Sequence, residues 1–110
     1  MNQIEAELAP LGVEVDPAWL DLALTHRSWA YENGAGPTNE RLEFLGDAIL
    51  GAVTATLLYG AFADRQEGTL AKIKSVVVSE DILAGVAREL QIDTLLLLGK
   101  GEDQTGGRTK

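Results

Sequence analysis

The sequence predicts an all-α fold in a single domain spanning residues 1–110, and three observations support this prediction. Residues that favour helix starts stand before several apolar stretches. The longest of these stretches repeats its apolar residues at helical spacing. The apolar fraction of 45% is typical of a folded globular chain, and 110 residues give enough mass for one modest core.

The first half of the chain predicts two short helices and a loop. Residues 3–9 form a short amphipathic segment that Pro10 ends. Asp16 and Pro17 predict a helix start, because Asp caps well and Pro suits the first turn. Residues 31–38 contain Asn-Gly, a second Gly and a Pro, which predicts a loop. The helix before that loop would carry on one face Trp19, Leu20, Ala23 and Leu24.

The second half predicts one long helix and two shorter ones. Thr38 or Asn39 caps a helix that runs to about Tyr59, with Gly60 as its stop. After a connection over residues 61–68, residues 70–78 are predicted to be helical, although three successive valines also suit a strand. Ser79 starts a further helix to about residue 90. Residues 95–98 fit a last turn or a strand, and the Gly-rich chain from residue 99 onward predicts a mobile loop.

The composition limits the chemistry and the partners of the chain. There is no cysteine, so neither a disulfide framework nor a thiolate metal site is possible. The net charge is −8, from 17 acidic and 9 basic residues. A domain that held RNA by charge alone would show a basic patch. If this domain acts on nucleic acid, divalent cations or a separate basic module must offset the repulsion.

The N-terminal residues lack the basic segment and apolar stretch of a signal peptide. No apolar run approaches the roughly 20 residues needed to cross a bilayer. We therefore expect a soluble, cytoplasmic protein without a membrane partner.

Three carboxylates share one face of the predicted long helix. At 100° per residue, Glu40, Glu43 and Asp47 fall within about 60° of one another. Neighbouring like charges repel, and a hard cation such as Mg²⁺, which binds carboxylate oxygens, would turn that repulsion into a binding site. The alternative is a solvated acidic face, which the helix dipole favours near an N-terminus. The stripe predicted to face the core lies elsewhere and consists of Leu42, Leu45, Ile49, Val53 and Leu57.

Two uncharged residues of this helix add to the interpretation. Phe44 lies beside the acids and away from the core stripe, which suggests a partner surface that adjoins the acidic face. Gly46 lies on the core side, where the missing side chain would let another helix approach closely.

Residues 39–47, Asn-Glu-Arg-Leu-Glu-Phe-Leu-Gly-Asp, resemble the most diagnostic motif of the ribonuclease III family. Three flanking segments match the same family in the correct order, so the resemblance covers nearly the whole chain. Leu-Thr-His-Arg-Ser at residues 24–28 resembles its early helix. The other two matches are Glu67-Gly68 with Leu70 and Lys72, and residues 98–102 with Gly106-Gly107.

This resemblance implies an all-α, ribonuclease III catalytic-domain-like helical bundle that forms a homodimer. It also implies cleavage of double-stranded RNA with Mg²⁺, for which Mn²⁺ can substitute, in the processing of rRNA and mRNA. By resemblance, Glu43 and Asp47 would be metal ligands, and Asp47 would be catalytic together with the auxiliary acids Glu40 and Glu67. The bound cation would offset the acidic charge. Residues implied at the dimer interface are Phe44 and Leu45.

The resemblance further implies parts of the family that follow the Gly-rich loop: a helix with a second Asp and Glu for the metal, and a double-stranded-RNA-binding domain. The sequence ends at Lys110, before both. We therefore expect an incomplete catalytic domain that shows no appreciable cleavage by itself.

Several other residues invite functional interpretations that the sequence does not favour. His26 is the only histidine, and its position beside Thr25 and Ser28 on an apolar helix favours a packed, hydrogen-bonded role. Trp19 and Trp29 are best explained as core or interface aromatics. Four residues imitate a phosphate-binding loop, but the spacing is wrong by one and Arg replaces Lys, so a flexible loop is favoured. They are Gly101, Gly106, Arg108 and Thr109.

Two alternatives to an enzyme stay open. One is a non-catalytic ribonuclease III-like domain for RNA binding or ribosome assembly. The other is an unrelated helical interaction domain, which would require the nine-residue motif to arise by chance. The acids Glu40, Glu43, Asp47 and Glu67 favour the enzyme over these alternatives, because a scaffold has no need of a metal cluster.

Overall fold

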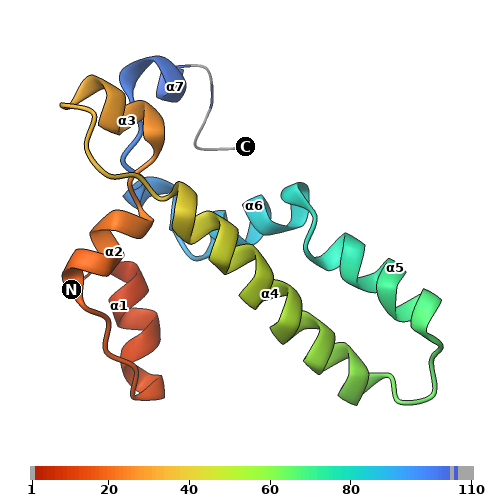
Figure 1. Cartoon of the computed structure of the whole chain (residues 1–110). Helices are drawn as coiled ribbons and strands as arrows, with labels where there is room; N and C mark the ends of the chain where they lie inside the picture. Colours follow the sequence, from red (N-terminus) through yellow and green to blue (C-terminus); the bar gives the residue numbers. More distant parts are fainter. Residues whose placement is uncertain (1, 105, 107–110) are drawn as a thin grey trace.

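The computed structural model describes residues 2–104 and 106 and confirms the all-α prediction. Within these residues the chain forms short and long helices in separate groups that diverge from a common junction (Figure 1). The described part has one β-bridge, between Thr25 and Leu97. The elements are α1 (Gln3–Leu8), η1 (Ala9–Leu11), α2 (Pro17–Ala23), α3 (Arg27–Glu32), α4 (Glu40–Ala61), α5 (Glu67–Val77), α6 (Glu80–Glu89), η2 (Asp93–Leu95) and α7 (Lys100–Gln104).

The predicted helix starts are confirmed by their caps. The Asp16 carboxylate accepts a hydrogen bond from the backbone N–H of Ala18 at 2.9 Å, and the Ser79 hydroxyl accepts one from Ile82 at 3.4 Å. At the start of α4, the hydroxyl of Thr38 accepts from the backbone N–H of Glu40 at 3.3 Å. Such side-chain acceptors satisfy backbone donors that a first helical turn leaves unpaired.

Other boundaries differ from the predictions. The long helix α4 continues through Gly60 to Ala61, and α5 begins at Glu67, before the predicted residue 70. The segment 24–28 is not one helix, because the backbone is extended at His26 and a new helix, α3, begins after it. The Gly-rich chain after Gly99 is helical over residues 100–104 rather than a loop. The remaining part of that prediction, at residues 107–110, lies outside the described residues.

Residues 24–26, which we call the elbow, form the junction between three groups of helices: α1 with α2, α3 with α7, and α4 with α5 and α6 (Figure 1). The carbonyl of Leu24 accepts from the backbone N–H of Leu97 at 2.8 Å, and the N–H of His26 donates to the Leu97 carbonyl at 3.0 Å. The backbone N–H of Asn39 donates to the Thr25 carbonyl at 2.9 Å, and the Asn39 carboxamide donates to Ala23 at 3.0 Å. The elbow therefore fixes the start of α4 against α2 and the C-terminal segment. The buried side chains around it are Leu20, Leu24, Thr25 and Ala30.

A second junction attaches α7 to α3. The backbone N–H of Gly99 donates to the Ser28 hydroxyl at 2.8 Å, and the N–H of Lys100 donates to the Glu32 carboxylate at 3.1 Å. Glu32 thus caps the start of α7, although it lies 68 positions earlier in the sequence. A negative charge is favourable at the N-terminus of a helix. Gly99 is buried, and a Cβ atom there would overlap the Glu32 carboxylate and lie 2.7 Å from the Ser28 carbonyl oxygen.

Gly99→Ala is therefore expected to destabilise the fold by about 1–3 kcal/mol, the usual cost of forcing an extra carbon into a packed site. Chemical denaturation of the two chains measures this difference. Gly60→Ala is the matched control, because a Cβ at that helical position meets nothing within 4 Å. It is expected to leave the free energy of unfolding unchanged or raise it by about 0.5–1 kcal/mol. Equal stabilities of the Gly99 variant and the original chain would contradict this account of the junction.

The predicted core stripe of α4 is wrong for this chain. Exposed fractions are 53% for Leu45, 54% for Ile49 and 67% for Leu57. The helix instead packs against α5, through a different face on which Thr54 is buried and Leu50 and Leu58 are half-buried. Helical spacing fixes which residues share a face, but burial also requires an element that covers that face. Gly46, predicted to receive a helix, has open space around it in the described structure.

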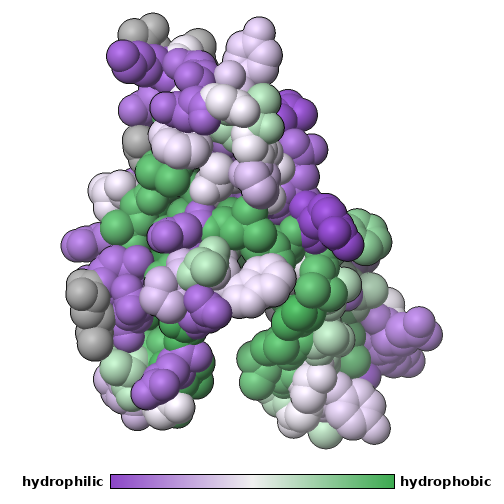
Figure 2. Space-filling view, turned by 60° about the vertical axis from the view of Figure 1, so that its left-hand side comes forward, coloured by the Kyte–Doolittle hydropathy of each residue, from purple (hydrophilic) through white to green (hydrophobic). Residues whose placement is uncertain are grey.

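The arrangement is open for a chain of this size. The radius of gyration is 16.1 Å, whereas about 13 Å is typical of 110 residues. The accessible surface is 8203 Å², whereas a folded monomer of 11.7 kDa exposes about 5,900 Å². Figure 2 shows hydrophobic side chains along a deep notch between the group of α1 and α2 and the group of α4 and α5. An apolar surface this extensive is typical of a region that contacts another protein segment.

Helix α4 also meets length and hydropathy criteria for a membrane span, with a mean hydropathy of 1.5. It is the one such helix within the described residues, which corrects the expectation that no segment would qualify. A single helix of this kind is weak support for membrane insertion, because core helices of soluble proteins pass the same criteria.

Candidate active site

The acids of the nine-residue motif lie in the first two turns of α4. Glu40, Glu43 and Asp47 are all exposed on this helix, and each acid lies about one turn from the next. No group of three or more His, Asp or Glu side chains within residues 2–104 and 106 is arranged to hold a metal ion. Two carboxylates one turn apart nevertheless suit Mg²⁺, which commonly takes one or two protein carboxylates and keeps several waters. Glu43 and Asp47 could thus provide part of an oxygen ligand set.

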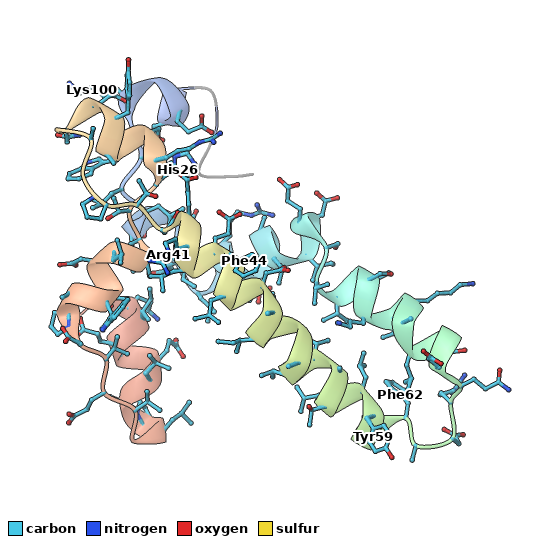
Figure 3. The ribbon with its side chains drawn as sticks, in the orientation of Figure 1. His26, Arg41, Phe44, Tyr59, Phe62 and Lys100 are labelled. Carbon is cyan, nitrogen blue, oxygen red and sulfur yellow. The ribbon has the colours of Figure 1, made fainter. Side chains whose placement is uncertain are left out.

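A cavity of about 260 Å³ opens beside these acids, where the starts of α3 and α4 meet at the elbow. The cavity combines one guanidinium, one imidazole and two carboxylates, so it offers both hydrogen-bond donors and acceptors. Figure 3 shows His26 next to the start of α4, which carries the labelled Arg41 and Phe44. The lining residues are His26, Arg27, Asn39, Glu40 and Glu43.

His26 is half-buried and caps α3. Its Nδ1 atom accepts from the backbone N–H of Ser28 at 3.1 Å and lies 2.7 Å from the Ser28 hydroxyl oxygen. These bonds agree with the hydrogen-bonded role that the sequence predicts. The predicted location on an apolar helix is wrong, since His26 lies in the extended elbow before α3.

Glu67, the fourth predicted acid, is not brought to the other three within one chain. It begins α5 and lines a separate cavity with Leu58, Tyr59 and Lys74. Along α4, eleven residues separate Asp47 from Leu58, which is about 17 Å at 1.5 Å per residue. Glu67 therefore cannot share one cation with Asp47 in the same chain.

The two predicted interface residues project from the start of α4. Phe44 is 83% exposed and Leu45 is 53% exposed. They border a cavity of about 830 Å³ between α2 and α4, lined also by Trp19, Leu22 and Leu42. Trp19 is itself exposed, so it is not part of the core of this chain. A large aromatic surrounded by other apolar side chains is typical of the central part of a protein interface.

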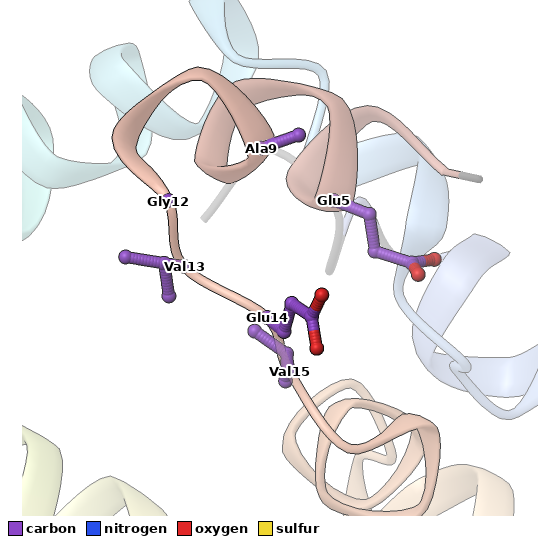
Figure 4. A pocket seen from close by; sticks show the side chains of 6 residues that line it. All are labelled: Glu5, Ala9, Gly12, Val13, Glu14 and Val15. Carbon is purple, nitrogen blue, oxygen red and sulfur yellow. The ribbon is translucent and has the colours of Figure 1, made fainter.

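Another cavity, of about 380 Å³, lies between α1 and the segment that leads to α2 (Figure 4). The carboxylates of Glu5 and Glu14 and small apolar side chains line it. The lining contains no histidine, cysteine, serine, lysine or arginine, so it offers neither a usual nucleophile nor a cationic anchor.

A family model described as Ribonuclease-III-like matches residues 16–110 of the chain. This match includes the acids of α4, the elbow and Glu67, and it excludes the whole lining of the cavity in Figure 4. Ribonuclease 3 of Thermobifida fusca (strain YX) is 57% identical over 100 residues, which are 91% of this chain and 42% of that protein. Ribonuclease 3 of Nocardia farcinica (strain IFM 10152) is 58% identical over 106 residues, which are 94% of this chain and 44% of that protein. The chain thus spans less than half the length of these relatives.

Two solved structures of the nuclease domain of ribonuclease III from Campylobacter jejuni share this arrangement, each with a TM-score of 0.81. Their sequence identities are 36% and 37%, over 97% and 100% of this chain and 73% of theirs. One of them is described as flexible in a region involved in dimer formation.

Proposed function

Because this chain belongs to the ribonuclease III family, we propose that it is part of an endoribonuclease that cleaves double-stranded RNA by Mg²⁺-dependent phosphodiester hydrolysis. The observation that carries this proposal is the row of exposed acids at the start of α4, inside the segment that matches the family. A scaffold domain has no need of such a row, whereas a phosphodiesterase needs it to hold a cation. Processing of rRNA and mRNA in the cytoplasm is the corresponding proposed role.

Glu43 and Asp47 would hold the cation, with water molecules as its remaining ligands. Bound there, Mg²⁺ supplies an acidified water and positive charge for the phosphate. Mn²⁺ would substitute, because it prefers the same oxygen ligands. Glu40 has a different environment, since it accepts a hydrogen bond from Thr38 at 3.4 Å, which suits an auxiliary acid better than a ligand.

We also propose that the chain acts as a homodimer through the surface around Phe44 and Leu45. Their exposure and the open apolar cavity beside them support this. A dimer would also provide the auxiliary acid, because Glu67 of one subunit could approach the acids of the other even though it cannot reach those of its own chain.

The test is a chimera in which this chain replaces the segment that it matches in Thermobifida fusca ribonuclease 3. We expect the chimera to cleave duplex RNA when Mg²⁺ or Mn²⁺ is present, to stop when a chelator removes the metal, and to spare single-stranded RNA of the same sequence. Gel analysis of end-labelled RNA measures all three results. A chimera that folds and binds duplex RNA but leaves it intact would favour the non-catalytic alternative.

A further inference from the structure

One edge of the His26 ring does not face Ser28. The ring lines the 260 Å³ cavity together with Glu40 and Glu43. It also lines a second cavity with Glu32 and Glu102. Since Nδ1 faces Ser28, the distal edge of the ring, which carries Nε2, is the edge left to face these cavities.

The hydrogen bonds around Nδ1 determine where the imidazole carries its proton. The Ser28 backbone N–H can only donate, so Nδ1 must act as its acceptor. The Ser28 hydroxyl oxygen accepts from the backbone N–H of Gly99, which leaves its own proton free to point to Nδ1. A proton on Nδ1 would oppose the Ser28 N–H. The neutral ring therefore carries its proton on Nε2.

A protonated Nε2 is a donor and cannot ligate a metal, because its lone pair is occupied. Four carboxylates line these two cavities and could accept its proton. Glu32 already accepts from Lys100, and Glu102 has an interaction partner of its own. Glu40 is hydrogen-bonded to Thr38. The Glu43 carboxylate has no hydrogen-bond partner within residues 2–104 and 106, so among the acids lining these two cavities it is the one that lacks a donor.

We propose that His26 is a positioning residue of the acidic site. His26 and Glu43 line the same cavity without a hydrogen bond between them in this structure, and on cation binding Nε2–H would donate to the Glu43 carboxylate and orient it toward the cation. This rests on the proposed function, since it assumes that Glu43 binds metal. Hydrogen bonds of this kind fix the direction of a ligand, and their loss typically weakens metal binding about 10- to 100-fold. The elbow holds the two residues together, because Asn39, at the start of α4, is bonded to Thr25 beside His26.

His26→Asn separates this role from the cap. Asparagine is a preferred N-cap residue and can accept from the Ser28 N–H, but its side chain is too short to place a donor where Nε2 lies. We expect the variant to unfold at the same denaturant concentration as the original chain and to bind Mn²⁺ about tenfold more weakly. Loss of the free Mn²⁺ signal in electron paramagnetic resonance measures binding. Arg27→Gln, a change at the neighbouring position in the cavity, controls for a general loss of polar lining.

Nitrogen NMR gives an independent measurement, because the chain has one histidine. We expect Nε2 to carry a proton and Nδ1 to carry none, in the metal-free chain and again in the presence of Mg²⁺. Mg²⁺ takes the place of Mn²⁺ in this measurement because it is diamagnetic. Any one of three results would overturn the proposal. These are a proton on Nδ1, loss of the Nε2 proton when Mg²⁺ binds, and a stably folded His26→Asn chain that binds Mn²⁺ as tightly as the original. If the original chain binds no Mn²⁺, the metal assignment of the proposed function fails first, and the positioning role fails with it.

Discussion

Asp47→Asn is expected to lower Mg²⁺-dependent cleavage by the chimera at least about a hundredfold. The substitution preserves the shape of the side chain and exchanges a charged oxygen ligand for a neutral amide. Loss of residues that merely support a ligand already weakens metal sites about 10- to 100-fold, so loss of a ligand should cost at least as much. Asp47 is exposed on α4, so the fold does not depend on its charge. Initial cleavage rates at a series of Mg²⁺ concentrations measure the effect.

Asp64→Asn is the matched control, since it makes the same chemical change at a side chain that is 90% exposed, in the connection between α4 and α5. We expect its cleavage rate to stay within about twofold of the original, as for most surface substitutions. A normal rate for the Asp47 variant would remove Asp47 from the metal site. A defect of equal size in both variants would indicate a general effect of charge rather than a ligand.

The parts of the fold that the sequence predicted are those that depend on neighbouring residues. Helix starts at Asp16 and Ser79 arise from bonds that span two and three positions, so the local residues suffice to recognise them. The helical period likewise placed Glu40, Glu43 and Asp47 together. Their placement near one another on one long helix, with Phe44 beside them, could therefore be predicted before the fold was known.

The parts that the sequence did not predict depend on distant contacts. Helix α7 consists of residues that look like a loop, and its first N–H groups are satisfied by Ser28 and Glu32, about 70 positions earlier. The extended elbow depends in the same way on Leu97. The helical period of the apolar stripe on α4 could not predict whether the stripe is buried, because burial depends on which other element covers that face. The proposed pairing of His26 with Glu43 depends on a cavity that only the folded chain forms.

Phe44→Ala is expected to weaken dimerisation of the chain about a thousandfold. A large aromatic that is buried in an interface typically contributes about 2 kcal/mol or more to binding. In a twofold-symmetric dimer the loss occurs twice, which gives about 4 kcal/mol and hence roughly three decades in the dissociation constant. Because Phe44 is 83% exposed in the single chain, its removal should leave the free energy of unfolding of the monomer nearly unchanged. Analytical ultracentrifugation over a range of concentrations measures the monomer–dimer equilibrium.

Tyr31→Ala provides the comparison, because Tyr31 is an aromatic of similar size that is 85% exposed on α3, away from the cavity beside Phe44. If exposure alone made an aromatic side chain promote dimerisation, the two substitutions would weaken the dimer to the same extent. We expect only the Phe44 variant to do so, since Phe44 alone adjoins the apolar cavity formed with Trp19 and Leu22. Two results would show that this surface does not bind a second copy. One is an original chain that stays monomeric at every concentration, and the other is a Phe44 variant that dimerises as tightly as the original chain.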